Sequence, residues 1–212
     1  MYFFQSLEEQ HAQKRSARNT FSLLQTGVCS LNQNTKVSTL HMSHAPTKLL
    51  HRGRQAALNY GGIGGVVGHE ITHGFDDDGR FYDAFGKRKE WWNEEVKKRY
   101  VQRAQCFIDQ YGKIEVPGTG LNVNGELTLS ENIADNGGVR LAYESASQEM
   151  CVWAYKTYLQ KHGQEERIEG LEEFDNEQMF FLGWAMNWCG HRTIESLIDQ
   201  VNTDPHSPAR YR

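Results

Sequence analysis

The sequence predicts a mainly helical (α+β) fold built around two helices that carry metal-binding residues. Three observations support this prediction. An HExxH motif lies in an apolar, glycine-rich segment, an acidic ENIAD motif opens a second helix-like segment, and three further segments have the composition and spacing of helices. We divide the 212 residues into a weakly structured arm, residues 1–57, and a part that carries the chemistry, residues 58–212.

Composition excludes several classes of protein. The chain has 23 Lys and Arg against 27 Asp and Glu, so no basic excess indicates a nucleic-acid partner. No apolar run approaches the roughly 18 residues of a membrane span. The first residues carry charges where a signal peptide needs its apolar stretch. We therefore expect no nucleic-acid partner and no membrane span, whereas the composition leaves the compartment, the disulfides and the oligomeric state open.

The arm, residues 1–57, differs in composition from the remainder. It carries seven Lys and Arg against two Glu, and all five Trp of the chain lie after residue 57. Ser, Thr, Asn and Gln are frequent in it, and its hydrophobic residues follow no sustained period. This composition predicts weak structure.

The segment LNYGGIGGVVGHEITHGFDDDGR, which begins at Leu58, contains the motif His69-Glu70-Ile71-Thr72-His73. Residues four apart in a helix lie on the same face, so both imidazoles can reach one ion, and zinc is the metal that this motif favours. Five glycines before the motif would each destabilise a free helix by about 1 kcal/mol, so we expect this segment to pack tightly against other backbone. The alternative is a buried helix whose histidines are only core residues.

Two further expectations concern the surroundings of this helix. Ile63, Val67 and Ile71 form an apolar stripe at about 100° per residue, on the flank opposite to the histidines. The following run, Asp76-Asp77-Asp78, lacks the alternating spacing of a calcium loop. We interpret it as a solvated turn that closes the helix.

Two histidines leave zinc one protein ligand short, and the best candidate is Glu131. Glu131 and Asp135 are four residues apart, so one carboxylate can bind metal while the other orients a zinc-bound histidine. However, Thr128-Leu129-Ser130-Glu131 also fits a capping box, in which Glu131 would only accept a backbone N–H. Spacing alone leaves both interpretations open.

Three other segments are predicted to be helical. A long amphipathic helix lies within KRKEWWNEEVKKRYVQRAQCFIDQYG and ends near Gly112, and two more helices lie within CVWAYKTYLQKHG and NEQMFFLGWAMNWCG. The charged face of the first is expected to be solvated. The spacing of four aromatic residues favours the core rather than a ligand platform: Phe180, Phe181, Trp184 and Trp188.

With both motifs in hand, the chain closely resembles the neprilysin and endothelin-converting-enzyme family of zinc metallopeptidases. The matching text is LNYGGIGGVVGHEITHGFDDDGR, ELTLSENIADNGGVRLAY, FFLGWAMNWCG and TDPHSPARYR, within residues 58–212. The resemblance implies an incomplete thermolysin-like (gluzincin) catalytic domain with one Zn²⁺ per chain, which hydrolyses peptide bonds of oligopeptide substrates. Relatives are mostly type II membrane proteins with extracellular catalytic domains, so it also implies an extracellular or cell-surface location.

The resemblance also implies a role for each residue of the site. The zinc ligands fall on His69, His73 and Glu131, and the catalytic base falls on Glu70. Asp135 supports a zinc-bound histidine, and His206 stabilises the transition state. Arg212 binds a substrate carbonyl, although the last residue of a chain is expected to fray.

Three parts of the family pattern are absent from this sequence: an N-A-[FY]-[FY] segment before the zinc helix, a large helical domain that caps the site, and a tail ending in C-x-x-W. Cys106 and Cys189 match family cysteines whose partners lie in those parts, so we expect both to be unpaired. We expect a truncated catalytic domain. The leading interpretation is a zinc metalloendopeptidase, and the alternative is a non-catalytic zinc-binding remnant or regulator.

Overall fold

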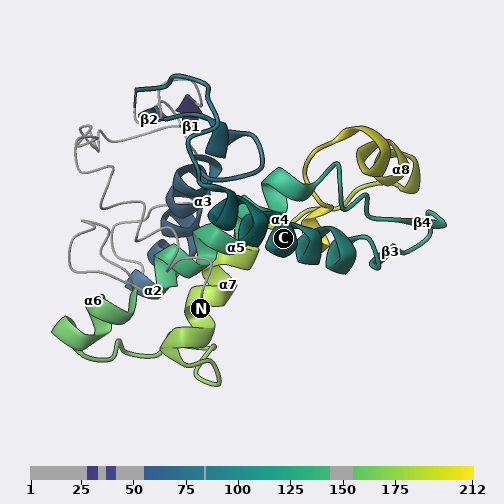
Figure 1. The fold of residues 1–212 in the computed structure, drawn as a ribbon. Coiled ribbons are helices and arrows are strands. Elements are labelled where there is room, and N and C mark those ends of the chain that lie inside the picture. The colour runs from purple at the N-terminus through teal and green to yellow at the C-terminus, as the bar shows by residue number, and fades with distance from the viewer. Residues whose placement is uncertain (1–27, 33–36, 42–54, 84, 144–154) are drawn as a thin grey trace.

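A computed structural model of the chain describes residues 28–32, 37–41, 55–83, 85–143 and 155–212, and it confirms the mainly helical fold (Figure 1). The principal elements in chain order are β1 (Val28–Asn32), β2 (Val37–His41), α2 (Ala56–Asn59), the π-helical turn η1 (Tyr60–Gly64), α3 (Gly65–His73), α4 (Glu94–Tyr111), β3 (Glu115–Val116), β4 (Leu121–Asn122), α5 (Leu129–Tyr143), α6 (Tyr155–His162), α7 (Asn176–Ala185) and α8 (Ile194–Thr203). Short 3₁₀ turns lie at Gly79–Phe81, Met186–Trp188 and Ala209–Tyr211.

The elements α2, η1 and α3 follow one another without a break and carry the HExxH motif at their end. The first turn has no side-chain cap of its own, because Gln55 makes no capping hydrogen bond there. Instead, the carboxylate of Glu165 accepts the N–H groups of Ala56 at 2.6 Å and Ala57 at 2.9 Å. A carboxylate at a helix N-terminus satisfies free N–H groups and complements the helix dipole. A residue more than a hundred positions away therefore anchors the start of this helical segment.

Helices α3 and α5 form the central pair of the fold, and their backbones meet at glycines. A Cβ atom on Gly68 would lie 2.5 Å from the carbonyl oxygen of Gly138 and 2.9 Å from its Cα atom. A Cβ on Gly138 would in turn collide with the backbone N–H of His69. The glycine-rich sequence is thus explained by close packing against other backbone, as expected from its cost to a free helix.

Among the described residues, three hydrophobic clusters surround this pair and hold it in place. One lies mainly between α4 and α5, a second joins α2, α5, α6 and α7, and a third joins the end of α4 to β3, β4 and α8. Their buried members are, in that order, Phe75, Trp92, Val96, Tyr100, Ala104, Leu129 and Ile133; Ala57, Ala142, Tyr155, Met179 and Phe180; and Tyr111, Val116, Val123 and Val201.

The remaining helices lie where the sequence predicts them, but Phe181 and Trp188 are less buried than expected. Helix α4 ends at Tyr111 with Gly112 as its C-cap, and α6 and α7 lie within their predicted segments. Phe181 was expected in the core but is 47% exposed, because it follows the buried Phe180 and points away from it around α7. Phe180 and Trp184 are buried, and Trp188 is half-buried.

The apolar stripe formed by Ile63, Val67 and Ile71 is half-buried. The fully buried flank is the one that carries Gly68, His69, Thr72 and His73. The physical reason is the contact with α5, which needs glycine on the facing side, so the side chains of the apolar stripe lie outside that contact.

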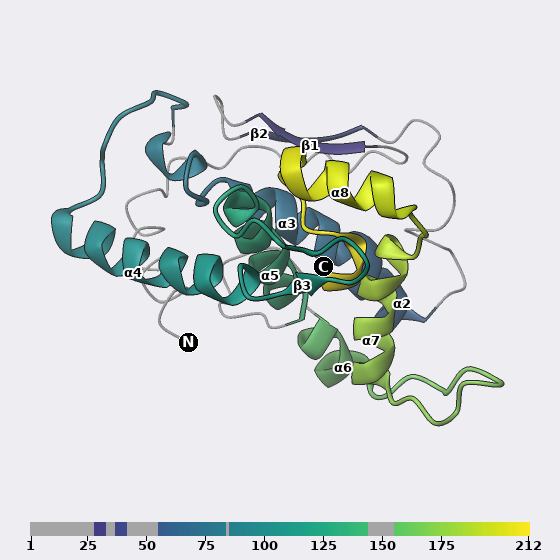
Figure 2. The same ribbon diagram turned by 90° about the vertical axis from the view of Figure 1, so that its right-hand side faces the viewer.

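Part of the arm assigned to residues 1–57 is described by the structure. Strands β1 and β2 form an antiparallel pair in which Val28 lies opposite His41, and β1 lies beside α3 (Figure 2). The rest of the arm before residue 55 lies outside the described residues. Cys106 and Cys189 are both free and exposed. Within the described ranges, no helix is long and apolar enough to cross a bilayer.

The glycine contact between α3 and α5 is directly testable. Gly68→Ala should lower the free energy of unfolding by about 1–3 kcal/mol, because the added methyl group overpacks a backbone-to-backbone contact. Gly190→Ala is the matched control, since no heavy atom lies within 4 Å of its added methyl group. Denaturant unfolding followed by circular dichroism measures both variants. Equal stability of Gly68→Ala and the wild type would contradict the packing.

Candidate metal centre

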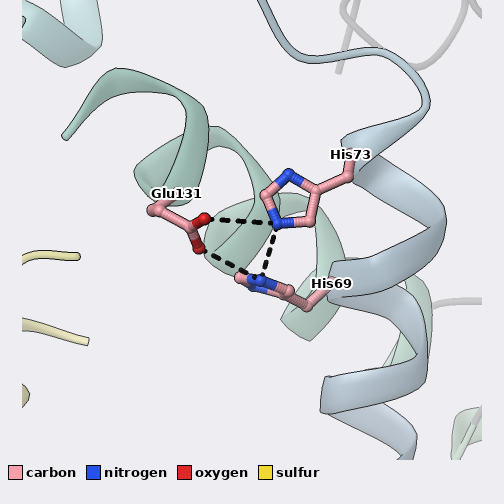
Figure 3. A group of neighbouring side chains, drawn as sticks. All are labelled: His69, His73 and Glu131. Atoms are coloured by element: carbon pink, nitrogen blue, oxygen red, sulfur yellow. Dashed lines mark hydrogen bonds and ion pairs between the residues drawn. The ribbon is translucent and has the colours of Figure 1, made fainter. Parts of the chain in front are cut away.

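The two motif histidines on α3 and Glu131 on α5 point toward one another (Figure 3). The Nε2 atoms of His69 and His73 lie 2.9 Å apart. Glu131 places one carboxylate oxygen 3.2 Å from His69 Nε2 and the other 3.5 Å from His73 Nε2. Both imidazoles are buried, and only 13% of the Glu131 side chain is exposed. The carboxylate thus faces the imidazoles rather than the backbone at the start of α5.

The second nitrogen of each imidazole is also bound by a carboxylate. His69 Nδ1 lies 2.8 Å from Asp135 Oδ1, and His73 Nδ1 lies 2.7 Å from Asp76 Oδ2. A carboxylate accepts the Nδ1–H, so the neutral imidazole keeps its proton there and offers the Nε2 lone pair to a metal. Both lone pairs are thereby directed toward the same point.

The contact made by Asp76 was missed by sequence reasoning, and the interpretation of this residue as part of a solvated turn is wrong. Asp76 is completely buried and also accepts a hydrogen bond of 2.6 Å from the hydroxyl of Ser130. Its burial comes from the loop after α3 folding back against α5. The available signal was its spacing, since a residue three positions after His73 can lie on the same flank.

The donor set fits a zinc ion. Two imidazole nitrogens and one carboxylate are common ligands of catalytic zinc, for which bonds of about 2.0–2.1 Å imply ligand atoms about 3.3 Å apart at tetrahedral angles. The distances among His69, His73 and Glu131 are close to this spacing. No protein atom needs to fill the fourth position in such a site, which catalytic zinc keeps for water or substrate.

The pKa values of Glu131 and of the two imidazoles depend on the hydrogen bonds that these groups make with one another and with their neighbours. Burial alone would raise the pKa of Glu131, but hydrogen bonds from His206, His69 and His73 outweigh it and hold that pKa far below its usual range. Burial likewise would lower the pKa of His73, but its bonds to Asp76 and Glu131 raise it to about 10. The pKa of His69 is raised in the same way, by Asp135 and Glu131, against the effect of burial. Without a metal, the imidazole of His73 is therefore protonated at pH 7.

His206 reaches the site from the loop that follows α8. Its Nε2 lies 3.2 Å from Glu131 Oε2, while Asp204 holds its Nδ1 at 2.8 Å. The neighbouring Ser207 is fully buried and donates a hydrogen bond of 2.7 Å to Asn132 on α5, which anchors the loop. The His206 side chain is 41% exposed, so it marks the open side of the site.

Arg212 is held firmly although it is the last residue. Its Nε lies 2.7 Å from Asp135 Oδ2 and its Nη2 lies 2.9 Å from Asp135 Oδ1, a bidentate ion pair. The guanidinium also lies 3.8 Å from the centre of the Trp188 ring. Only 8% of the side chain is exposed, so the expected fraying does not extend to this side chain. Asp135 and Arg212 also border a cavity of about 510 Å³ lined by Tyr143, Phe181 and Trp184.

The structure accordingly brings His69, His73, Glu131, Asp135, His206 and Arg212 into one connected group. Glu70 lies between the two histidines on α3 and is half-buried. Asp76, Ser130, Asn132 and Ser207 are the members that the motifs did not indicate.

Comparison with known proteins places these residues in a family context. The peptidase family M13 pattern matches residues 33–212, a range that begins inside the arm. Neprilysin-1 of Caenorhabditis elegans is 50% identical over 157 residues, which is 74% of this chain and 20% of that protein. Endothelin-converting enzyme 1 of Cavia porcellus is 45% identical over 167 residues, which is 79% of this chain and 21% of that protein.

Solved structures give the same result. The crystal structure of the Mycobacterium tuberculosis zinc metalloprotease ZMP1 in complex with an inhibitor is similar to this chain, with a TM-score of 0.73 and 31% sequence identity. The match covers 87% of this chain and 27% of that chain. The chain thus spans about a fifth of the length of the curated relatives it matches.

The coupled charges predict that zinc displaces protons when it binds. With a pKa of about 10, His73 is protonated at pH 7 in the metal-free chain, and a protonated imidazole cannot ligate zinc. Isothermal titration calorimetry in two buffers of different ionisation enthalpy should show release of at least one proton per zinc at pH 7. Affinity should rise with pH, about tenfold per unit for each proton displaced. Binding without proton release would contradict the charge state.

Proposed function

The chain belongs to peptidase family M13, and on this premise we propose that it is a zinc metalloendopeptidase catalytic fragment that hydrolyses peptide bonds of oligopeptides. The observation that carries the proposal is the convergence of His69, His73 and Glu131, each backed by further polar groups. In this proposal the three residues would hold one Zn²⁺, and the chemistry that such an ion would supply is polarisation of a carbonyl and a lowered pKa of water.

We assign the general base to Glu70. It lies on α3 between the two histidines and is half-buried, and the glutamate at this place of an HExxH helix is the residue type that serves as the base beside a histidine-bound zinc. A carboxylate in this place takes the proton of the attacking water and returns it to the leaving amine. Asp135 has a supporting role, because it orients His69 and is itself held by Arg212.

His206 is the proposed donor to the oxyanion that forms on the scissile carbonyl. Its hydrogen bond to Glu131 raises the pKa of its imidazole, which favours the protonated, donating form near neutral pH. Asp204 and the anchored Ser207 fix its direction. One such donor typically contributes about 10²–10³ in rate.

Arg212 is proposed to bind a backbone carbonyl of the substrate. Its Nε and Nη2 already bind Asp135, so a substrate would be bound through the remaining nitrogen of the same rigid guanidinium. The M13 membership and the neprilysin-like relatives support peptide substrates and an extracellular or cell-surface location as parts of the same proposal.

The alternative function is a zinc-binding remnant or regulator without turnover. The observation that favours it is the short span of the match, about a fifth of each relative. The two functions share the metal site and differ only in catalysis, so a single assay separates them.

Two substitutions separate the base from the ligands. Glu70→Gln should retain one zinc per chain and slow cleavage of a quenched fluorescent peptide by about 10²–10⁴-fold, because the proton acceptor is lost. Glu131→Ala should lose zinc, because one of three ligands is removed. Zinc content is measured by mass spectrometry and cleavage by fluorescence, with a chelator as control. Cleavage by Glu70→Gln at the wild-type rate would disprove the base, and a wild type that binds zinc without cleavage would establish the alternative.

A further inference from the structure

Asp76 was not indicated by the motifs, yet both oxygens of its carboxylate accept hydrogen bonds. Its Oδ1 accepts the backbone N–H groups of Asp78 at 3.0 Å and Gly79 at 2.6 Å. Its Oδ2 accepts the Nδ1–H of His73 at 2.7 Å and the hydroxyl of Ser130 at 2.6 Å. Four donors thus surround a side chain with no exposed surface.

The two oxygens serve different parts of the fold. Oδ1 is bound by the loop that follows α3, and a Cβ on Gly79 would collide with the carbonyl oxygen of His73, so this loop turns back closely over the end of the helix. The carboxylate plane is fixed from this side. Oδ2 is thereby directed at the imidazole and at α5.

The bond to Ser130 connects the two helices that carry the metal ligands. Ser130 directly precedes Glu131 in the first turn of α5, whereas His73 is the last residue of α3. One carboxylate oxygen therefore holds a histidine ligand and the neighbour of the carboxylate ligand at once.

We propose that Asp76 is a positioning residue for the metal centre: it fixes His73 in the tautomer that presents Nε2 to the ion, and through Ser130 it sets the distance at which Glu131 faces the histidines. This inference rests on the zinc site of the proposed function, but it does not depend on peptide hydrolysis. Carboxylates that bind the second nitrogen of a metal-bound imidazole typically affect metal affinity by about 10–100-fold.

The geometry makes Asp76→Asn a sharp test, because an amide cannot satisfy both sides. If its oxygen accepts the two backbone N–H groups, its NH₂ faces Nδ1 of His73 and stabilises the tautomer with the proton on Nε2. If the amide is turned round, its NH₂ meets the N–H groups of Asp78 and Gly79. Either orientation disfavours the metal-binding form or leaves buried donors facing each other.

The experiment measures zinc affinity of the full chain by competition with a chromophoric chelator, together with the visible absorption of the Co²⁺-substituted protein. Asp76→Asn should weaken zinc binding by about 10–100-fold and alter the Co²⁺ spectrum. Ser130→Ala should weaken it by less, because the imidazole bond remains. Asp78→Asn is the matched control and should bind zinc like the wild type, since this carboxylate is half-exposed and pairs with Arg88 at the surface.

Each outcome decides the proposal. Wild-type zinc affinity and Co²⁺ spectrum in Asp76→Asn would overturn it, and so would an equal loss in Asp78→Asn. If Asp76→Asn fails to fold by circular dichroism, Ser130→Ala decides, and an unchanged affinity in that folded variant overturns the proposal. A wild-type chain that binds no zinc would refute the proposed function and this inference together. Zinc binding and cleavage by the wild type, with unchanged zinc binding in Asp76→Asn, would refute only this inference.

Discussion

The close approach of α3 and α5 is the constraint on which the rest of the structure depends. Gly68 and Gly138 let the two backbones touch, and only then do side chains of ordinary length from the two helices meet at one point. Two histidines one turn apart on α3 need a third donor from elsewhere, and Glu131 reaches them because glycines let α5 approach α3 closely. The three hydrophobic clusters and the distant cap by Glu165 serve this arrangement by holding both helices in register.

The charged groups around the two imidazoles are the second determinant of the site. Three buried or nearly buried carboxylates surround the two imidazoles, and one guanidinium offsets part of their charge. With neutral imidazoles, Asp76, Glu131 and Asp135 together with Arg212 carry a formal charge of −2, equal and opposite to the charge of a divalent cation. Charges held this deeply are tolerated only when they are paired and hydrogen-bonded, so a metal ion is the physical counterpart of this arrangement.

Much of the site could be predicted from the sequence because it rests on local spacing. The fourfold separations in the HExxH and ENxxD motifs indicate which side chains share a helix face, and Gly112 indicates where α4 ends. Contacts made across the fold were beyond such reasoning. The burial of Asp76 depends on a loop folding onto α5, and the apolar stripe at Ile63 and Val67 is only half-buried because the flank of α3 that faces α5 carries glycine. Residue spacing indicates which side chains share a helix face, but packing against neighbouring backbone determines which face is buried.

X-ray absorption at the zinc edge on the purified chain tests the central claim most directly, because it reports both the amount of metal and the atoms around it. We expect one zinc per chain with two imidazole nitrogens at about 2.0–2.1 Å, a carboxylate oxygen, and a light-atom ligand in the fourth position. Sulfur ligands, a single imidazole or no bound zinc would contradict it. Sulfur in particular would mean that cysteine, and not the group formed by His69, His73 and Glu131, holds the metal.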